Sequence, residues 1–176
     1  MWLMDNDKPV WVGAVGPFNP GPNWEIKGTG DFNGDGNDDI LWQGSDGTPA
    51  VWMMDGAHVD WLGTVGPFNP GPNWEIKGTG DFNGDGRSDI LWQGSDGTPA
   101  IWLMDGASAV SVGVAGSFNP GPSWEVKGAA DVNGDGNSDI LWQGSNGTPA
   151  IWLMDGLSAT DVAGLPNLGA DWHVIA

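Results

Sequence analysis

Short apolar runs recur along the whole chain and are separated by turns rich in Gly, Pro, Asp and Asn. Residues 39–43 and 50–54 are apolar at consecutive positions, so we expect strands that are buried on both faces. Further strands are expected at 24–28 and 58–65, and Asp-Gly pairs mark the hairpin turns. No stretch has the spacing of an amphipathic helix, so the pattern predicts an all-β protein.

This set of four strands repeats every 50 residues. Residues 16–36 are identical to 66–86, and residues 39–50 are identical to 89–100. Such identity indicates recent duplication or deliberate design, and the sequence does not separate the two. A repeat of about 50 residues with four strands, buried on both faces, is typical of the blades of a β-propeller.

The repeat divides the chain into three complete blades and one split blade. The three Pro residues of 66–72 cannot join a strand ladder, so this segment is predicted to cross from one blade to the next. Residues 1–15 match the last two strands of a blade, and residues 172–176 match a first strand. The predicted units are 1–23 (two strands of the split blade and a crossover), 24–73, 74–123, 124–170, and 171–176 (the strand that completes the split blade).

The split blade predicts how the ring closes. Two chains could close an eight-bladed ring, in which each first strand lies beside the N-terminal hairpin of the other chain and seals its edge. A four-bladed ring from one chain, or a fragment of a longer array, are the alternatives. We favour the homodimer, because a four-bladed ring leaves little room for blades so rich in Trp.

One loop in each repeat has the pattern of a cation site. Asp31, Asn33 and Asp35 alternate, Gly36 permits a sharp turn, and Asp39 follows three residues later. Side chains of the first, third, fifth and ninth residues and the carbonyl of the seventh are the candidate ligands. They are Asp31, Asn33, Asp35, Asn37 and Asp39; Asp81, Asn83, Asp85, Arg87 and Asp89; and Asp131, Asn133, Asp135, Asn137 and Asp139.

Calcium is the expected ion, with about three per chain. It accepts roughly six to eight oxygen ligands in flexible geometry, whereas magnesium demands a tight octahedron. Zinc is disfavoured because the loops offer neither His nor Cys. The twelfth position is Trp42 rather than a Glu, so the loop is not an EF-hand. We expect a structural role, because without metal the carboxylates within one loop would repel each other.

These residues resemble the FG-GAP/VCBS-type repeats of bacterial surface and secreted proteins, which are related to the propeller of integrin α-subunits. The resemblance rests on the loop with its Asp-Ile-Leu-Trp-Gln strand, on Trp-Glu-Ile before it, and on Ile-Trp-Leu-Met-Asp-Gly after it. It covers essentially the whole chain. It implies a propeller with calcium in each loop and a binding or adhesive role, and hence an extracellular or cell-surface location. The chain is shorter than the seven blades usual in integrins.

Composition excludes several partners. The net charge of −18, with only five Lys and Arg residues, disfavours nucleic acid and an anionic membrane surface. Three bound divalent cations would add six positive charges and bring −18 to −12. There is no Cys, no run of transmembrane length, and no signal peptide at residues 1–5.

No catalytic constellation is predicted. His58 and His173 are the only His residues, and neither belongs to a repeated catalytic position. Glu25 and Lys27 lie two residues apart on one strand, as do their copies, and we expect ion pairs near the central channel. A paired-carboxylate glycosidase would need an asymmetric site that near-identical blades do not easily provide.

The favoured function is therefore a non-enzymatic, lectin-like module that binds carbohydrate at repeated sites. Most Trp residues, such as Trp42 and Trp52, are expected between blades. The candidate ligand-binding residues are Trp11, Trp61, Phe68, Asn69, Phe118, Asn119, Gln43, Gln93 and Gln143. A structural or protein-interaction scaffold is the alternative, and a scaffold of a polysaccharide-degrading enzyme is a distant third.

Overall fold

The computed structural model describes residues 2–5, 8–12, 18–167, 169 and 173–174, with the backbone alone for 2–5 and 9–12. The described part contains strands and turns and no helix, so the all-β prediction is confirmed. It accordingly contains no helix that is long and apolar enough to cross a membrane. Three four-stranded antiparallel sheets follow one another, each built from one repeat, and a separate two-stranded sheet precedes them.

Each four-stranded sheet uses its strands in chain order, which is the order expected of a propeller blade. The first blade contains β3 (Trp24–Gly30), β4 (Asp39–Gly44), β5 (Pro49–Asp55) and β6 (His58–Thr64). The second contains β7 (Trp74–Gly80), β8 (Asp89–Gly94), β9 (Pro99–Asp105) and β10 (Ser108–Val114). The third contains β11 (Trp124–Ala130), β12 (Asp139–Gly144), β13 (Pro149–Asp155) and β14 (Ser158–Gly164).

The predicted strands differ from the observed ones only at their ends. The first strand extends to Gly30 rather than to residue 28, and the third includes Pro49 and Asp55. Pro49 is the first residue of its strand, a position where the missing amide donor is tolerated. The fourth strand ends at Thr64, one residue before the predicted end.

The blades stack face to face through apolar cores. One core joins Leu41, Val51 and Met53 of the first blade to Trp92 and Trp102 of the second. A second core joins the other face of the second blade to the third. Trp92 and Trp142 are buried in the cores between blades, as predicted for these Trp residues. Trp42 and Trp52, by contrast, lie in a separate core that consists of first-blade residues.

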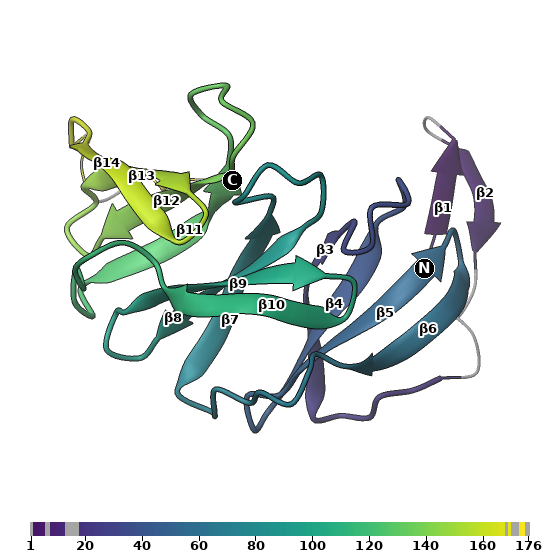
Figure 1. Ribbon diagram of the computed structural model, residues 1–176. Helices are drawn as coiled ribbons and strands as arrows, with labels where there is room; N and C mark the ends of the chain where they lie inside the picture. The colour runs from purple at the N-terminus through teal and green to yellow at the C-terminus, as the bar shows by residue number, and fades with distance from the viewer. Residues whose placement is uncertain (1, 6–7, 13–17, 168, 170–172, 175–176) are drawn as a thin grey trace.

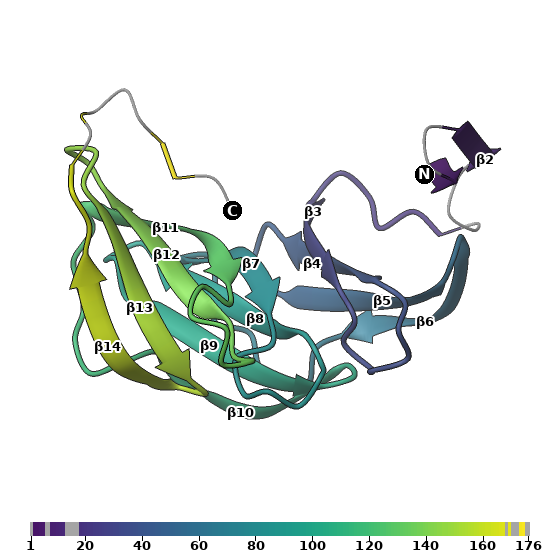
Figure 2. The same ribbon diagram turned by 90° about the horizontal axis from the view of Figure 1, so that it is seen from above.

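The separate sheet is the hairpin of β1 (Trp2–Asp5) and β2 (Lys8–Val12). Its closing pair, Asp5 opposite Lys8, matches Asp55 opposite His58 in the first blade. Residues 2–5 and 8–12 thus pair with the register of the last two strands of a blade, and their membership of a split blade stays a prediction. The blades form a curved row, and the hairpin stands at the end of the row opposite to β14 (Figures 1 and 2).

The first strand of every blade contains a β-bulge. Ile26 pairs with Trp42 and Gly28 with Leu41, so Lys27 is an extra residue without a partner in the ladder. Lys77 and Lys127 occupy the same place in the next two blades. A bulge bends the strand and redirects a side chain. These strands also lie beside one another, and Thr79 Oγ1 donates to the carbonyl of Thr29 at 2.7 Å.

Candidate functional site

The predicted metal loops connect the first and second strands of each blade and fold in the same way three times. Asp31 organises the first loop: its Oδ1 accepts hydrogen bonds from the amides of Gly34 at 2.6 Å and Asp35 at 3.1 Å. Its Oδ2 accepts from the amide of Gly36 at 2.8 Å. The carboxylate thus binds the inward-pointing amides that a loop of this curvature would otherwise leave without partners.

The next two side chains continue the pattern. Asn33 Oδ1 accepts from the amide of Asp35 at 2.9 Å, and Asp35 Oδ1 accepts from the amide of Asn37 at 2.7 Å. The amide nitrogen of Asn33 also donates to Asp35 Oδ2 at 2.8 Å. Hydrogen bonds from Asn33 and Asn37 lower the pKa of Asp35, so this carboxylate remains ionised. Equivalent hydrogen bonds form in the loops that begin at Asp81 and Asp131.

The last acidic residue of each loop also connects the loop to the rest of its blade. Asp39 is fully buried, and its two oxygens accept from the amides of Phe32 at 3.0 Å and Met54 at 2.8 Å. It therefore ties the loop to the third strand of the blade. Burial raises the pKa of Asp39, and burial together with nearby carboxylates raises the pKa of Asp89 to about 7.

The loops offer oxygen ligands without forming a closed cage. Among the described residues, no three acidic or His side chains converge on one point. Both carboxylate oxygens of Asp39 accept from backbone amides, one in the loop at Phe32 and one in the third strand at Met54. A carboxylate has about four lone pairs, however, and each oxygen of Asp31 and Asp39 accepts only one or two hydrogen bonds. The donor set of Asp31, Asn33, Asp35 and Asp39 therefore has the oxygen chemistry that a hard cation prefers.

Arg87 links two loops. Its Nε lies 3.5 Å from the carbonyl oxygen of Asn33 in the preceding loop and 3.6 Å from Asp105 Oδ1. Its Nη1 lies 4.0 Å from Asp85 Oδ2 in its own loop. Arg87 was predicted to contribute only its carbonyl, and in the structure its side chain also connects its own loop to the preceding one. The first and third loops have Asn37 and Asn137 at the equivalent position.

Most of the predicted ligand-binding residues hold the blades together. Gln93 Nε2 donates to the carbonyl of Trp124 at 2.8 Å, and its Oε1 accepts from the amide of Val126 at 3.0 Å. Gln43 makes the same two contacts with Trp74 and Ile76. Gln143 Oε1 accepts from the amide of Val174 at 3.4 Å. Gln43 and Gln93 thus join their blades to the first strand of the next blade, and Gln143 joins the third blade to Val174.

The crossover residues are also engaged. Asn69 Nδ2 donates to Thr48 Oγ1 at 2.8 Å, and Asn119 makes the equivalent bond with Thr98. Phe68 and Phe118 are half exposed and pack against Trp102 and Trp152, respectively. Trp61 is half exposed on an outer strand, and the side chain of Trp11 lies outside the described residues.

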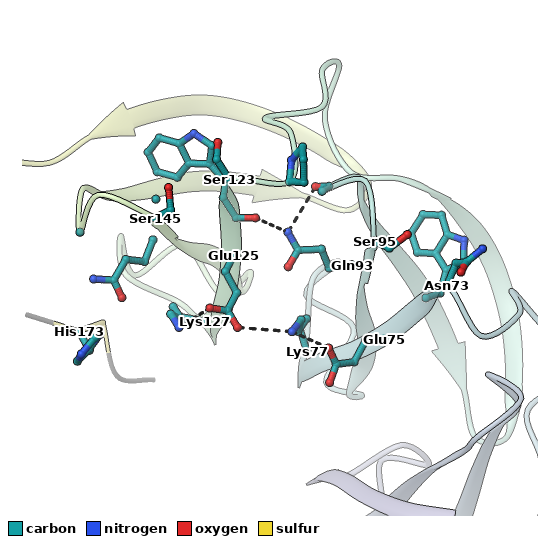
Figure 3. Close-up of a pocket in the computed structure, with 18 of the residues that line it drawn as sticks. Asn73, Glu75, Lys77, Gln93, Ser95, Ser123, Glu125, Lys127, Ser145 and His173 are labelled. Atoms are coloured by element: carbon teal, nitrogen blue, oxygen red, sulfur yellow. Dashed lines mark hydrogen bonds and ion pairs between the residues drawn. The ribbon is translucent and has the colours of Figure 1, made fainter. Parts of the chain in front are cut away.

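A recess repeats at the boundaries between blades, on the side of the first strands. The recess between the first and second blades has a volume of about 350 Å³, and Glu25, Ser45 and Trp74 line it. The next one has a volume of about 600 Å³ and reaches His173. Figure 3 shows its polar side chains, with Lys77 between Glu75 and Glu125 and with Ser95 and Ser145 nearby.

Ion pairs cross the floor of these recesses. Lys27 Nζ lies 3.1 Å from Glu25 and 3.3 Å from Glu75, and Lys77 Nζ lies 2.7 Å from Glu75 and 3.6 Å from Glu125. Hydrogen bonds from Lys77 lower the pKa of Glu75, so its carboxylate stays charged. The predicted pairs within a strand are present, and the bulge lets Lys27 and Lys77 also reach the next blade.

The recesses and the loops lie at opposite ends of the strands. Trp24 pairs with Gly44 at the recess end, whereas Gly30 pairs with Asp39 at the loop end. The seven residues between Trp24 and Gly30 correspond to about 20 Å. The recess was not predicted from the sequence, although the identical Pro-Asn-Trp segments at 22–24 and 72–74 mark its rim.

The comparison with known families agrees with this architecture. Residues 81–142 match the model of the FG-GAP-like repeat, and they contain the second and third loops and the blade strands between them. The FG-GAP-like character predicted from the sequence is therefore confirmed for this segment. No match to a curated protein was found.

Proposed function

We propose that this protein is a non-enzymatic binding module that recognises carbohydrate in the recesses between its blades. The observation that carries the proposal is the repetition: two successive boundaries hold recesses lined by corresponding Glu, Lys, Gln, Ser and Trp residues. Volumes of about 350 and 600 Å³ lie in the usual range of small-ligand sites.

The chemistry of the recess suits a sugar ring. Trp74 and Trp124 are partly exposed there and offer indole surface, whereas Ser95 and Glu75 are exposed and offer hydrogen-bond partners for hydroxyl groups. The carboxylates and ammonium groups neutralise one another, so a neutral polar ligand fits better than a strongly charged one. Several weak equivalent sites on one molecule would gain affinity by multivalency.

Calcium has a structural part in the proposal. Asp31, Asn33, Asp35 and Asp39, with the carbonyl of Asn37, would hold the ion in the first loop, and the corresponding residues would do so in the other two. A bound cation would neutralise acidic side chains that have few cationic partners in a chain of net charge −18. It would thereby stiffen the loop that Asp39 ties to the third strand.

We also propose that the module works outside the cell or at its surface, where calcium is abundant. Catalysis is not part of the proposal. His58 is exposed on an outer strand and pairs with Asp60 at 3.3 Å, and the Glu residues of the recess are engaged by Lys. A glycosidase would need an acid whose pKa is raised, whereas the pKa values of Glu75 and Glu125 are lowered by Lys77 and Lys127.

A glycan array tests the proposal, first in calcium and then in chelator. The informative variant replaces Ser45, Ser95 and Ser145 with Arg, because these exposed turn residues line the recess and a large side chain would fill it. The matched control makes the same change to Arg at Ser108 and Ser158, which are exposed on outer strands. We expect the first variant to lose binding at least tenfold and the control to bind normally.

Two other outcomes of the glycan array would contradict a site in the recess. Loss of binding in Trp61→Ala, with normal binding in the Arg variant, would place the sugar on the outer strand and contradict the recess. No glycan binding by folded protein would leave the alternative function, a scaffold for protein assembly. The bonds of Gln43 and Gln93 across the boundaries favour that alternative, because they rigidify the row of blades.

A further inference from the structure

The outer face of the third blade is an unfinished blade boundary. Phe32 and Phe82 occupy equivalent positions in the first two blades and are fully buried, whereas Val132 in the third is 45% exposed. Similarly, Val65 and Ala115 are fully buried, whereas Leu165 is 40% exposed. The third blade thus presents the face that the other two blades bury against a following blade.

The two complete boundaries show which element covers this face. The turn between the third and fourth strands of the next blade does so: the amide of Gly106 donates to the carbonyl of Phe32 at 2.9 Å, and that of Gly156 to Phe82 at 2.7 Å. In the same core, Met154 and Trp152 pack with Phe82. Among the described residues, no backbone amide of a following unit donates to the carbonyl of Val132.

In the part of the chain that the structure describes, one hairpin of the required kind lacks a blade. β1 and β2 form a sheet of their own, with the closing pair Asp5 and Lys8. The sequence Trp-Leu-Met-Asp at 2–5 is the same as at 152–155, so Trp2 and Met4 correspond to Trp152 and Met154. A two-stranded hairpin is marginally stable alone and has an open edge.

One contact expected of the first strand of the missing blade is present at the third blade. The amide of Val174 donates to Gln143 Oε1, which is the contact that Val126 makes with Gln93. Val174 therefore lies beside the third blade at the place that the first strand of a following blade would occupy. The hairpin, however, lies at the other end of the row (Figures 1 and 2).

We propose that the β1–β2 hairpin of a second copy of this chain docks on the exposed face of the third blade. Val132 and Leu165 would then be covered as Phe82 and Ala115 are, and the hairpin would gain an apolar neighbour. The contact is reciprocal, because the hairpin of each copy serves the third blade of the other. This inference is independent of the carbohydrate proposal.

The mass in solution tests the inference. Light scattering should give wild-type protein a mass of twice the 18.4 kDa chain. Val132→Glu and Trp2→Glu should each shift the dissociation constant at least tenfold toward monomer. Val110→Glu is the matched control, because Val110 is 63% exposed on β10, and it should remain dimeric. A monomeric wild type, or a Val132→Glu variant as dimeric as the control, would overturn the proposal.

Mixing the variants guards against a mere folding defect. The Val132→Glu chain keeps an intact hairpin, and the Trp2→Glu chain keeps an intact third blade, so together they should form a one-to-one dimer with one good contact. Failure to associate, from chains whose circular dichroism matches wild type, would count against the proposal.

Cross-linking identifies which hairpin is bound. The chain has no Cys, so Val132→Cys and Asp7→Cys can be made as separate single-cysteine chains. A short bis-maleimide should join the mixed chains into dimers. In a chain carrying both substitutions, a link formed only within that chain would show that the hairpin folds back on its own third blade.

Discussion

Gln93 and Val126 are joined across a blade boundary: Gln93 Oε1 accepts a hydrogen bond from the amide of Val126 at 3.0 Å. Both residues are buried, and the other end of the Gln93 amide donates to Trp124. One side chain thus takes the place of a strand neighbour for two backbone groups of the next blade, which stabilises the angle between the sheets.

Replacement of this side chain should loosen the boundary. We expect Gln93→Leu to lower the free energy of unfolding by about 1–3 kcal/mol, because two buried backbone groups lose their partner. Urea denaturation monitored by Trp fluorescence measures the change. Ser95→Ala, in the exposed turn nearby, is the control and should be neutral. Equal stability of both variants would mean that the bonds contribute nothing.

The turn at Gly97 should tolerate no side chain. Gly97 has a φ of 91°, and a Cβ atom there would overlap the carbonyl of Gly121 in the crossover. Gly156 has a φ of 57°, but a Cβ atom there would meet no neighbour within 4 Å. We expect Gly156→Ala to cost about 1 kcal/mol from backbone strain and Gly97→Ala clearly more. Thermal unfolding measures the stability of both variants. Similar losses of stability would show that the close approach of Gly97 to Gly121 is unimportant.

Proton release should accompany calcium binding at the second loop. Because burial and nearby carboxylates raise the pKa of Asp89 to about 7, the metal-free loop keeps a proton at pH 6 that a cation must displace. The apparent affinity should fall by up to about tenfold per pH unit below pH 7. Calorimetry in buffers of different ionisation enthalpy should detect protons released at pH 6 and almost none at pH 8. Equal release at both values would contradict this coupling.

The raised pKa of Asp89 also determines whether the metal-free protein becomes more or less stable as the pH rises. The pKa of Asp89 is higher in the folded protein than its ordinary value of 3.8. Its contribution to stability is therefore fully present below about pH 4 and is lost as the pH rises through 7. In chelator, Asp89→Asn should remove part of this loss, measured as the melting temperature between pH 5 and 8. A wild-type protein whose melting temperature rises steadily over this range would refute it.

The ion pairs of the recess should behave in the opposite way. The hydrogen bond from Lys77 lowers the pKa of Glu75, so the contribution of this pair is present above about pH 4.5 and is lost as the pH falls through the lowered pKa. Because Glu75 is 53% exposed, we expect Glu75→Gln to change stability by less than about 1 kcal/mol at pH 7. The difference should disappear in acid, and a loss that persists at pH 3 would have another cause.

The sequence predicts what depends on local pattern and repetition. The strands around Ile40 and Trp52 follow from consecutive apolar residues between turns, and the burial of Trp92 and Trp142 follows from the need to cover both faces of a blade. The position of Asp31 and Asp35 in one loop follows from their alternate spacing. These features involve residues that are close in the chain.

Features that depend on neighbouring blades were not predictable. Gln93 looked free to bind a ligand, because the sequence does not show that the backbone of Trp124 and Val126 lies opposite it. Lys27 was expected to pair within its strand, and only the bulge and the adjacent sheet explain its contact with Glu75. The burial of Asp39 against Met54 likewise depends on how the hairpin of its blade folds back.

The separation of loops and recesses gives the row of blades an electrical polarity. At the recess end, Glu25, Glu75 and Glu125 pair with Lys27, Lys77 and Lys127 and the turns add Asp46 and Asp96, whereas each loop at the other end carries at least three Asp residues. The two rims therefore differ in potential across about 20 Å. Dissolved cations would therefore gather more at the loop end than at the recess end.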